Sequence, residues 1–235
     1  MQTYIDKNII YDWLNINISL KKIAYDLNQI GFESTIIDNA ISVSIPSNRE
    51  DCNYIIGIIK EISILYNVEI NFKKFEKKLK KFDEISLNIE NYNFCPKYNY
   101  VIIKNINQKE VPKYIKNTLK NSNFKLNNLI IDIVNFVTLE LGQPLHAYDL
   151  KHINAISIKK NDVNRNIKLI NDNIINIKRG IYVTESKNNI ISIPGIIGCA
   201  NSKVTENTKE ILVESAIFNS NKIIRTENFL NLSTK

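Results

Sequence analysis

The sequence predicts an α+β fold in which a small helix–strand–helix module precedes a mixed α/β domain. Near the start, two segments with apolar residues at the helical period flank a short segment in which apolar and polar residues alternate. From residue 85 onward, strand-like runs are joined by turns rich in Asn and Asp. This change of pattern indicates two regions of different architecture within the 235 residues.

The first module is predicted to contain two helices and one strand. Ser19 can cap a helix whose end is marked by Gly31, because glycine readily adopts the left-handed conformation that stops a helix. Residues 41–45 alternate between apolar and polar and therefore predict a half-buried strand. Residues 53–66 carry the second helical pattern. We place the first domain at residues 1–72.

A lysine-rich segment separates the two regions. We interpret residues 73–88 as a basic linker, with RNA contact as the alternative role of its lysines. Residues 89–235 form the second predicted domain, with a helix at about 112–121 that Pro112 opens. Strand-like runs in this domain cover residues 99–106, 129–134, 166–170, 174–178, 181–184 and 211–218.

Composition and charge narrow the setting of the protein. The net charge of +7 suits an RNA partner. The sequence is also rich in Ile, Asn, Lys and Tyr, a composition typical of an AT-rich genome, which raises the lysine content whatever the function. No apolar run of about 18 residues predicts a membrane span, and the first residues lack the layout of a secretory signal. Cys52, Cys95 and Cys199 match neither a zinc spacing nor a disulfide framework, so we expect a cytoplasmic protein.

Two loops concentrate glycine and proline in a chain that has only 6 and 5 of them. Gly142–Pro144 and Pro194–Gly198 therefore mark backbone that turns tightly or approaches a ligand. His146 follows the first loop, and Glu214 lies in a later apolar run, where a carboxylate needs donors or a pocket. The alternatives are a hydrogen-bonded loop histidine for His146 and an exposed strand position for Glu214.

The segment DIVNFVTLELGQPLHAYD at residues 132–149 closely resembles a signature of the bacterial-type phenylalanine–tRNA ligase β subunit. Further motifs resemble the same family in the same order. They are YDWL at 11–14, GFE at 31–33, SNREDC at 47–52, CPKY at 95–98, IPGIIG at 193–198 and LVESAIF at 212–218. The resemblance covers essentially the whole chain and implies the N-terminal and editing region of that subunit.

This resemblance implies hydrolysis of mischarged Tyr-tRNA at the ester that joins tyrosine to the terminal adenosine. Glu214 would accept from the tyrosine hydroxyl, and would gain a donor only when that hydroxyl arrives. Gly198 would leave room for the tyrosine ring. His146 and Asn135 would position the ester, the adenosine and the attacking water, with His146 as general base or as a purely geometric support. The remaining residues implied in substrate binding are Pro144, Gly195, Val134, Cys199 and Thr234.

The resemblance also implies partners. The family's α subunit activates phenylalanine with ATP and magnesium, and the two subunits form an α2β2 enzyme that charges the tRNA for phenylalanine. This chain shows no ATP-binding motif, so we expect no cofactor in it and no synthesis without the α subunit. The expected partners are therefore the α subunit and the tRNA, with no membrane.

Several departures from the family pattern support an alternative function. Only about a dozen residues join Glu33 to Ser47, where the family inserts an OB-type tRNA-binding domain, so we expect a compact helical module without a barrel. Val134 replaces a threonine and Cys199 replaces a glycine. The family motif at residues 232–235 would continue beyond Lys235, so we expect an editing domain truncated at its C-terminal end. The alternative is a structural or tRNA-binding remnant whose editing site has decayed.

A rival alignment places the first module on the family's later magnesium-binding module. The metal ligands would then fall at Asp51, Gly57, Lys60 and Glu61. Neither glycine nor lysine can supply a carboxylate oxygen, so two of the four ligands are missing. We therefore expect no metal site in this chain.

Overall fold

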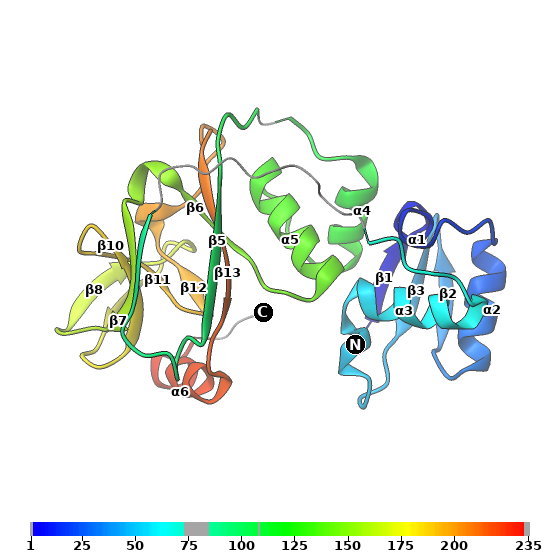
Figure 1. The fold of residues 1–235 in the computed structure, drawn as a ribbon, viewed down its shortest axis with the longest axis horizontal. Helices are drawn as coiled ribbons and strands as arrows, with labels where there is room; N and C mark the ends of the chain where they lie inside the picture. The colour runs from blue at the N-terminus through cyan, green and yellow to red at the C-terminus, as the bar shows by residue number, and fades with distance from the viewer. Residues whose placement is uncertain (1, 73–84, 108, 233–235) are drawn as a thin grey trace. The chain divides into compact units, whose positions relative to one another are not determined.

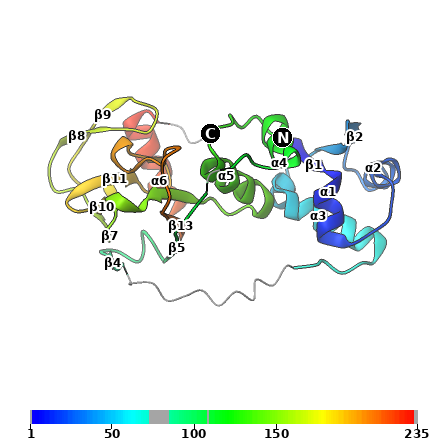
Figure 2. The same cartoon turned by 90° about the horizontal axis from the view of Figure 1, so that it is seen from above.

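The computed structural model describes residues 2–72, 85–107 and 109–232. Most of the predicted basic linker and Thr234 lie outside these residues. The chain divides into two compact units, Met1–Leu79 with Lys109–Pro144 and Lys80–Gln108 with Leu145–Lys235. Figures 1 and 2 show their elements, and each unit is described by itself. No helix in the described ranges has the length and hydropathy of a membrane-crossing segment.

The first unit contains a three-stranded antiparallel sheet with strand order β1–β3–β2, where we expected one strand between two helices. Its first part comprises β1 (Gln2–Asp6), α1 (Lys7–Leu14), α2 (Leu20–Gln29), β2 (Ser34–Ile37), β3 (Ala40–Ser44), η1 (Glu50–Asn53) and α3 (Ile55–Tyr66). The predicted cap of α2 is present, since the Ser19 side chain accepts from the Lys22 backbone N–H at 3.3 Å. The predicted elements correspond to α2, β3 and α3, whereas β1, β2 and α1 are additional.

The first unit also takes in α4 (Lys113–Asn121) and α5 (Leu129–Leu141), two segments that we placed in the second domain and of which we predicted only the first as a helix. Their buried residues share one hydrophobic cluster with the N-terminal module. The contributors from this segment are Val111, Ile115, Leu119, Phe136 and Leu139. The segment 109–144 packs with the N-terminal elements, so the two compact units do not follow the domain boundary that we predicted at residue 89.

The strand predicted at residues 129–134 is wrong, because this segment forms the first half of α5. The Asn128 side chain caps the helix by accepting from the Ile131 backbone N–H at 3.1 Å. Gly142 ends the helix with φ 77°, in the left-handed region. A nearly continuous apolar run has no period that separates a buried strand from a buried helix.

In its described residues, 85–107 and 145–232, the second unit contains three sheets. The three-stranded sheet has the order β5–β13–β6, the five-stranded sheet β12–β11–β10–β7–β4, and the small sheet pairs β8 with β9. The strands are β4 (Ser86–Ile89), β5 (Lys97–Ile103), β6 (His146–Asp149), β7 (Ala155–Lys160), β8 (Arg165–Lys168), β9 (Ile174–Ile177), β10 (Tyr182–Ser186), β11 (Asn189–Ile193), β12 (Ile197–Gly198) and β13 (Ile211–Ile217). Two short 3-10 helices, η2 (Leu150–His152) and η3 (Ala200–Ser202), and the helix α6 (Ser220–Leu230) complete the unit.

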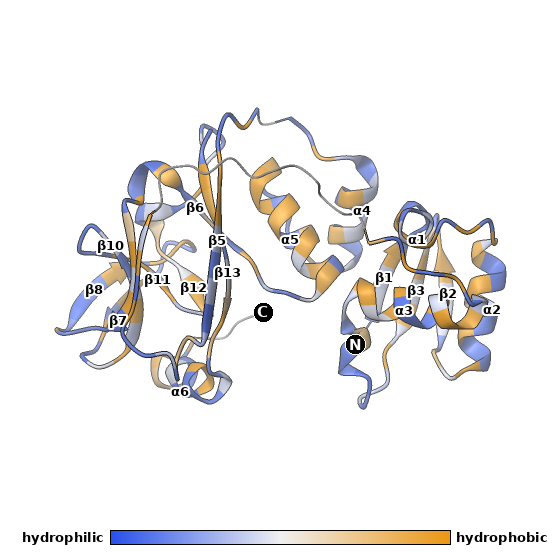
Figure 3. Cartoon of the chain, viewed as in Figure 1, coloured by the Kyte–Doolittle hydropathy of each residue, from blue (hydrophilic) through white to orange (hydrophobic). Residues whose placement is uncertain are grey.

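In the described part of the second unit, buried hydrophobic residues form two clusters. One includes Phe94, Tyr98, Tyr148, Tyr182 and Leu212, and the other includes Leu169, Ile177, Val183, Ile193 and Cys199. Figure 3 shows the difference between α5 of the first unit, which is apolar along most of its length, and α6, on which polar and apolar residues mix. The α+β class predicted from the sequence is confirmed in both units.

Asparagine ends several of the helices. Helices α1, α3 and α6 terminate at Asn15, Asn67 and Asn231, each in the left-handed region with φ of 49–50°. Most helices in proteins that end this way use glycine, and asparagine is the usual substitute. These three helix ends therefore use asparagine where glycine is more usual, in a chain that has few glycines.

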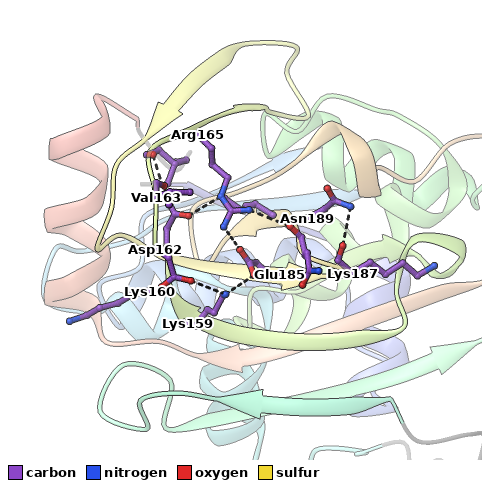
Figure 4. A network of polar contacts seen from close by, with 12 residues as sticks. Lys159, Lys160, Asp162, Val163, Arg165, Glu185, Lys187 and Asn189 are labelled. Carbon is purple, nitrogen blue, oxygen red and sulfur yellow. Dashed lines mark hydrogen bonds and ion pairs between the residues drawn. The ribbon is translucent and has the colours of Figure 1, made fainter.

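A polar cluster on β7, β8 and β10 holds a buried carboxylate (Figure 4). Glu185 accepts from Arg165 Nη2 at 2.6 Å and pairs with Lys159 Nζ at 3.0 Å. The Asn161 side-chain oxygen accepts from Arg165 Nε at 2.9 Å and fixes the guanidinium. We call Lys159, Asn161, Arg165 and Glu185 the cation-held cluster. It joins three strands of the second unit and needs no ligand.

Candidate functional site

The register of the three-stranded sheet brings Glu214 and His146 together. Glu214 on β13 lies directly opposite His146 on β6, and opposite Tyr100 on β5. Residues paired in this way project from the same face of a sheet. Tyr98 and Tyr148, two positions along their strands, lie on that same face. The strand pairing alone therefore gathers a carboxylate, an imidazole and several phenols from distant segments.

Glu214 is buried, with 7% of its surface exposed. Its Oε2 accepts from Tyr98 Oη at 2.7 Å and from Tyr148 Oη at 2.9 Å. Burial raises the pKa of the carboxyl, and the two hydroxyl donors partly offset that rise. The expectation that Glu214 gains a donor only from substrate is wrong, because two resident phenols already bind it. No group in the described ranges donates to Oε1.

A third hydroxyl extends this arrangement. Tyr148 Oη lies 2.8 Å from Ser192 Oγ on β11. Because Tyr148 uses its one proton on Glu214, Ser192 must donate to Tyr148. Burial, and then the charge of Glu214, raise the pKa of both Tyr98 and Tyr148, so both phenols remain donors. The hydrogen-bond chain therefore runs from Ser192 through Tyr148 to Glu214.

His146 is half-buried beside this network. Its ring meets that of Tyr148 edge-on, with centroids 4.5 Å apart. Burial lowers the pKa of His146 to about 4. The imidazole is consequently neutral at pH 7, with one nitrogen as donor and one as acceptor. Within the described ranges, neither nitrogen has a hydrogen-bond partner.

Gly198 makes room for this imidazole. A Cβ at position 198 would lie 2.7 Å from His146 Cε1 and 2.8 Å from Nε2, closer than side chains approach one another. The absence of a side chain at Gly198 therefore leaves the space that the His146 ring occupies. The space that we expected Gly198 to leave for a tyrosine ring is occupied by the His146 ring.

Gly195 and Cys199 have structural surroundings instead. Gly195 has φ 72° in a turn closed by the Ile196 backbone N–H donating to the Ile193 carbonyl at 3.0 Å. Proline before such a glycine is the pattern of a type II turn. Cys199 is buried in the hydrophobic cluster around Leu169, and burial raises the pKa of its thiol to about 12. Neither residue is thereby brought against His146.

The other predicted site residues lie elsewhere. Val134 and Asn135 belong to α5 and Pro144 follows it, all three in the first unit. Val134 is buried and Asn135 is half-buried. The predicted approach of Asn135 to His146 stays a prediction, because the two residues belong to separately described units. His146, Gly198 and Glu214 are the three that the structure brings together.

Tyr98, Tyr148 and Ser192 had not been predicted as site residues. Tyr148 stands two residues after His146, and Tyr98 lies in the CPKY motif. The period of two along a strand could have placed Tyr148 on the same face as His146. No sequence pattern could have aimed Tyr98 at Glu214 or Ser192 at Tyr148, since these contacts depend on how the strands are arranged in the fold.

One group in the first unit has metal-ligating atoms close together. The ligand atoms of Asp51, Cys52 and Glu61 lie within 4.8 Å of one another. Arg49 Nη2 contacts all three, at 2.8 Å from Asp51, 3.2 Å from Cys52 and 2.6 Å from Glu61. Its guanidinium holds the pKa of Asp51 at about 2. The guanidinium thus supplies the positive charge that a metal ion would bring.

Comparison with known proteins now gives the family. Residues 94–235 match the model of the B3/4 domain, so the chain belongs to the B3/4 domain family. The chain is similar to phenylalanine–tRNA ligase β subunits, which confirms the resemblance seen in the sequence. The subunit of Acinetobacter baylyi is 33% identical over 77% of this chain, and the chloroplastic subunit of Pyropia yezoensis is 33% identical over 95%.

These relatives are much longer proteins. The chain spans 23% of the Acinetobacter subunit and 34% of the Pyropia subunit. A solved N-terminal fragment of the phenylalanyl-tRNA synthetase β subunit from Pyrococcus horikoshii aligns with 98% of this chain at 13% identity and a TM-score of 0.48. Family membership therefore rests on the sequence matches.

Proposed function

We propose that the second unit carries an esterase site that hydrolyses Tyr-tRNA charged in error on the tRNA for phenylalanine. The observation that carries this proposal is the pairing of an unpartnered imidazole with a carboxylate that keeps one acceptor oxygen free. The β-subunit relatives are named as phenylalanine–tRNA ligase subunits, which supports an aminoacyl-tRNA as substrate.

Glu214 would select tyrosine through Oε1. The substrate hydroxyl donates to this oxygen, whereas phenylalanine leaves it without a partner. Sites built to bind a hydroxyl reject the analogue that lacks it, because a buried polar group is then unpaired. The resident phenols on Oε2 do not compete, since they occupy the other oxygen.

His146 would position the attacking water or the ester. A general base works best when its pKa lies near the working pH, and the pKa of His146 is about 4. A neutral imidazole still donates one hydrogen bond and accepts another, which suits orientation of water. We therefore favour the positioning role over general-base catalysis. The role of Asn135 that the family resemblance implies stays a prediction.

The wider assignment is a β subunit, or a part of one, of a phenylalanine–tRNA ligase in the cytoplasm. Its α-subunit partner would carry the synthesis that uses ATP and magnesium, and the tRNA for phenylalanine would be the shared substrate. The chain spans 23% and 34% of the two relatives, so the activity and partners of the whole ligase are proposed for it.

A structural or tRNA-binding remnant is the second candidate. One observation favours it: the His146 ring fills the space next to Gly198, where an open slot for the substrate ring was expected. Val134, which lacks the threonine hydroxyl of the family pattern, points the same way. On this alternative the network around Glu214 only stabilises the sheet.

The deciding experiment measures release of radiolabelled tyrosine from Tyr-tRNA by the purified chain, with and without the α subunit. We expect hydrolysis of Tyr-tRNA and sparing of Phe-tRNA. His146→Ala should slow release for both esters, whereas Glu214→Ala should erode the preference for tyrosine. If no form exceeds spontaneous hydrolysis, the esterase proposal fails and the remnant stands.

A further inference from the structure

We infer that Tyr98, Tyr148 and Ser192 are positioning residues that hold Glu214 as an anion with Oε1 as its one free acceptor, and so make the site selective for a ligand hydroxyl. We call these three residues and Glu214 the hydroxyl-held cluster. The identity of the hydroxyl ligand as the tyrosine of Tyr-tRNA rests on the proposed function. The role of the cluster itself rests on geometry.

The charge of Glu214 is supported by hydroxyl groups alone. Its two donors are the phenols of Tyr98 and Tyr148, at 2.7 and 2.9 Å. In the described part of the chain, no lysine, arginine or histidine forms an ion pair with it. Ser192 donates to Tyr148 from behind, which polarises the phenol that bonds the carboxylate. Removing one hydroxyl therefore removes a large part of the support for the charge.

The same bonds fix the direction of the free oxygen. Tyr98 comes from β5 and Tyr148 from β6, on the two sides of β13. Tyr148 is fully buried and Tyr98 is 8% exposed, and both belong to one hydrophobic cluster. Two fixed donors on Oε2 hold the carboxylate from both sides, so Oε1 has little freedom to turn.

Selectivity follows from the charge state. An ionised carboxylate only accepts hydrogen bonds, so it favours a ligand hydroxyl and repels a ligand carboxylate. A protonated carboxyl can also donate, and loses that discrimination. The preference for a hydroxyl should therefore hold only above the pKa of Glu214, and loss of a resident donor should move that threshold to higher pH.

Tyr148 also touches His146, which the test must separate from its hydroxyl. The contact between Tyr148 and His146 is made by the two rings. Tyr148→Phe keeps the ring and removes only the hydroxyl. Ser192→Ala removes the outer donor without changing either aromatic residue, and serves as a milder second variant.

Tyr182→Phe is the matched control. Tyr182 is 8% exposed, as Tyr98 is, and lies in the same hydrophobic cluster. Its hydroxyl accepts from the Asn91 amide at 2.9 Å and does not touch Glu214. Loss of this phenol hydroxyl perturbs the same core without changing the donors of the carboxylate.

The first measurement needs no activity. The full chain is labelled with 13C at the glutamate carboxyl carbons, and Glu214 is titrated by NMR after assignment with Glu214→Gln. We expect Tyr98→Phe and Tyr148→Phe to raise the Glu214 titration midpoint clearly, Ser192→Ala to raise it less, and Tyr182→Phe to leave it unchanged. Equal midpoints in Tyr148→Phe and Tyr182→Phe would overturn the inference.

The second measurement is the ratio of Tyr-tRNA to Phe-tRNA hydrolysis as a function of pH. Tyr148→Phe should lower the ratio at least tenfold at pH 7 and recover it as the pH rises, whereas a purely structural role would lower it at every pH. A ratio that stays low at high pH therefore counts against the inference. Shifted NMR midpoints without hydrolysis by any form would support the positioning role and overturn the esterase function alone.

Discussion

Two buried carboxylates in the second unit are held in opposite ways. Glu185 lies in the cation-held cluster, between a guanidinium and an ammonium at 2.6 and 3.0 Å (Figure 4). Glu214 lies in the hydroxyl-held cluster, bonded by two phenols on one oxygen. Both are almost fully buried. The charge of Glu185 is neutralised within the fold, whereas Glu214 keeps one carboxylate oxygen free to accept from a ligand.

The difference separates stabilising roles from binding roles. A buried anion matched by cations is satisfied, and removal of one partner leaves an expensive unpaired charge. A buried anion supported only by hydroxyls is a weaker element of structure, with capacity to accept another donor. Burial of a carboxylate is therefore no guide to function until its donors are counted.

The largest expected effect comes from Glu185→Ala. Loss of the carboxylate leaves Arg165 without its anion and leaves Lys159 with only the exposed Asp162 at 3.2 Å, which should lower the free energy of unfolding by about 3 kcal/mol. Glu214→Gln should cost only about 1 kcal/mol, because the amide oxygen still accepts from the phenols. Urea unfolding followed by circular dichroism measures both. Equal losses would contradict the comparison.

The pH dependence of stability should reveal His146 next to the hydroxyl-held cluster. Its pKa is about 4 in the fold and near 6.5 when unfolded, so the unfolded chain binds more protons between these values. Stability should therefore rise with pH from about 4 to 6.5 and then level off, with an amplitude of about 2 kcal/mol for a half-buried group. The measure is the difference between wild type and His146→Gln. Parallel curves for the two proteins would refute a lowered pKa.

A double-mutant cycle should sharpen the assignment of donors. Tyr148→Phe and Glu214→Gln should couple by about 1 kcal/mol in the free energy of unfolding, since Glu214→Gln weakens to a neutral bond the same charged hydrogen bond that Tyr148→Phe removes. Tyr182→Phe with Glu214→Gln should couple by less than about 0.5 kcal/mol, the usual limit for residues without a shared partner. Similar coupling in the two cycles would show that the effect is general loosening of the core.

The smallest effect is expected at Cys199. Cys199→Ala should lower the free energy of unfolding by about 1 kcal/mol, because a small side chain leaves the hydrophobic cluster. It should leave hydrolysis and the pH curve unchanged, since the thiol belongs to the hydrophobic cluster around Leu169 and is not one of the donors of Glu214. Gly198→Ala provides the contrast one residue earlier, because its methyl group would displace the His146 ring. A change in hydrolysis with Cys199→Ala would place the thiol in the site after all.

Local patterns in the sequence predicted some elements and failed for others, for identifiable reasons. The helices α2 and α3 and the strand β3 carry clear periods, and the Ser19 cap is a local interaction. The start of α5 has no period, because Ile130, Ile131, Ile133 and Val134 are all apolar, and its length decides in favour of a helix. Short strands such as β12, with two residues, leave almost no pattern to read.

The site was predictable only as far as motifs reach. His146, Gly198 and Glu214 lie within the motifs that carry the family resemblance, and the structure places them together. The hydrogen bonds of Glu214 and of Tyr148 depend on the order β5–β13–β6 and on the position of β11, which no local pattern contains. The donors of Glu214 could therefore be named only from the fold.

The asparagines at the helix ends have a consequence for engineering thermal resistance. Left-handed backbone costs an ordinary L-residue roughly 1–2 kcal/mol, and asparagine escapes only part of this strain. Asn15, Asn67 and Asn231 each occupy such a position, at the ends of three helices. Exchange of each for glycine would relieve the strain without touching the core or the site. These three asparagines are therefore candidate positions for simple thermostabilising substitutions by glycine.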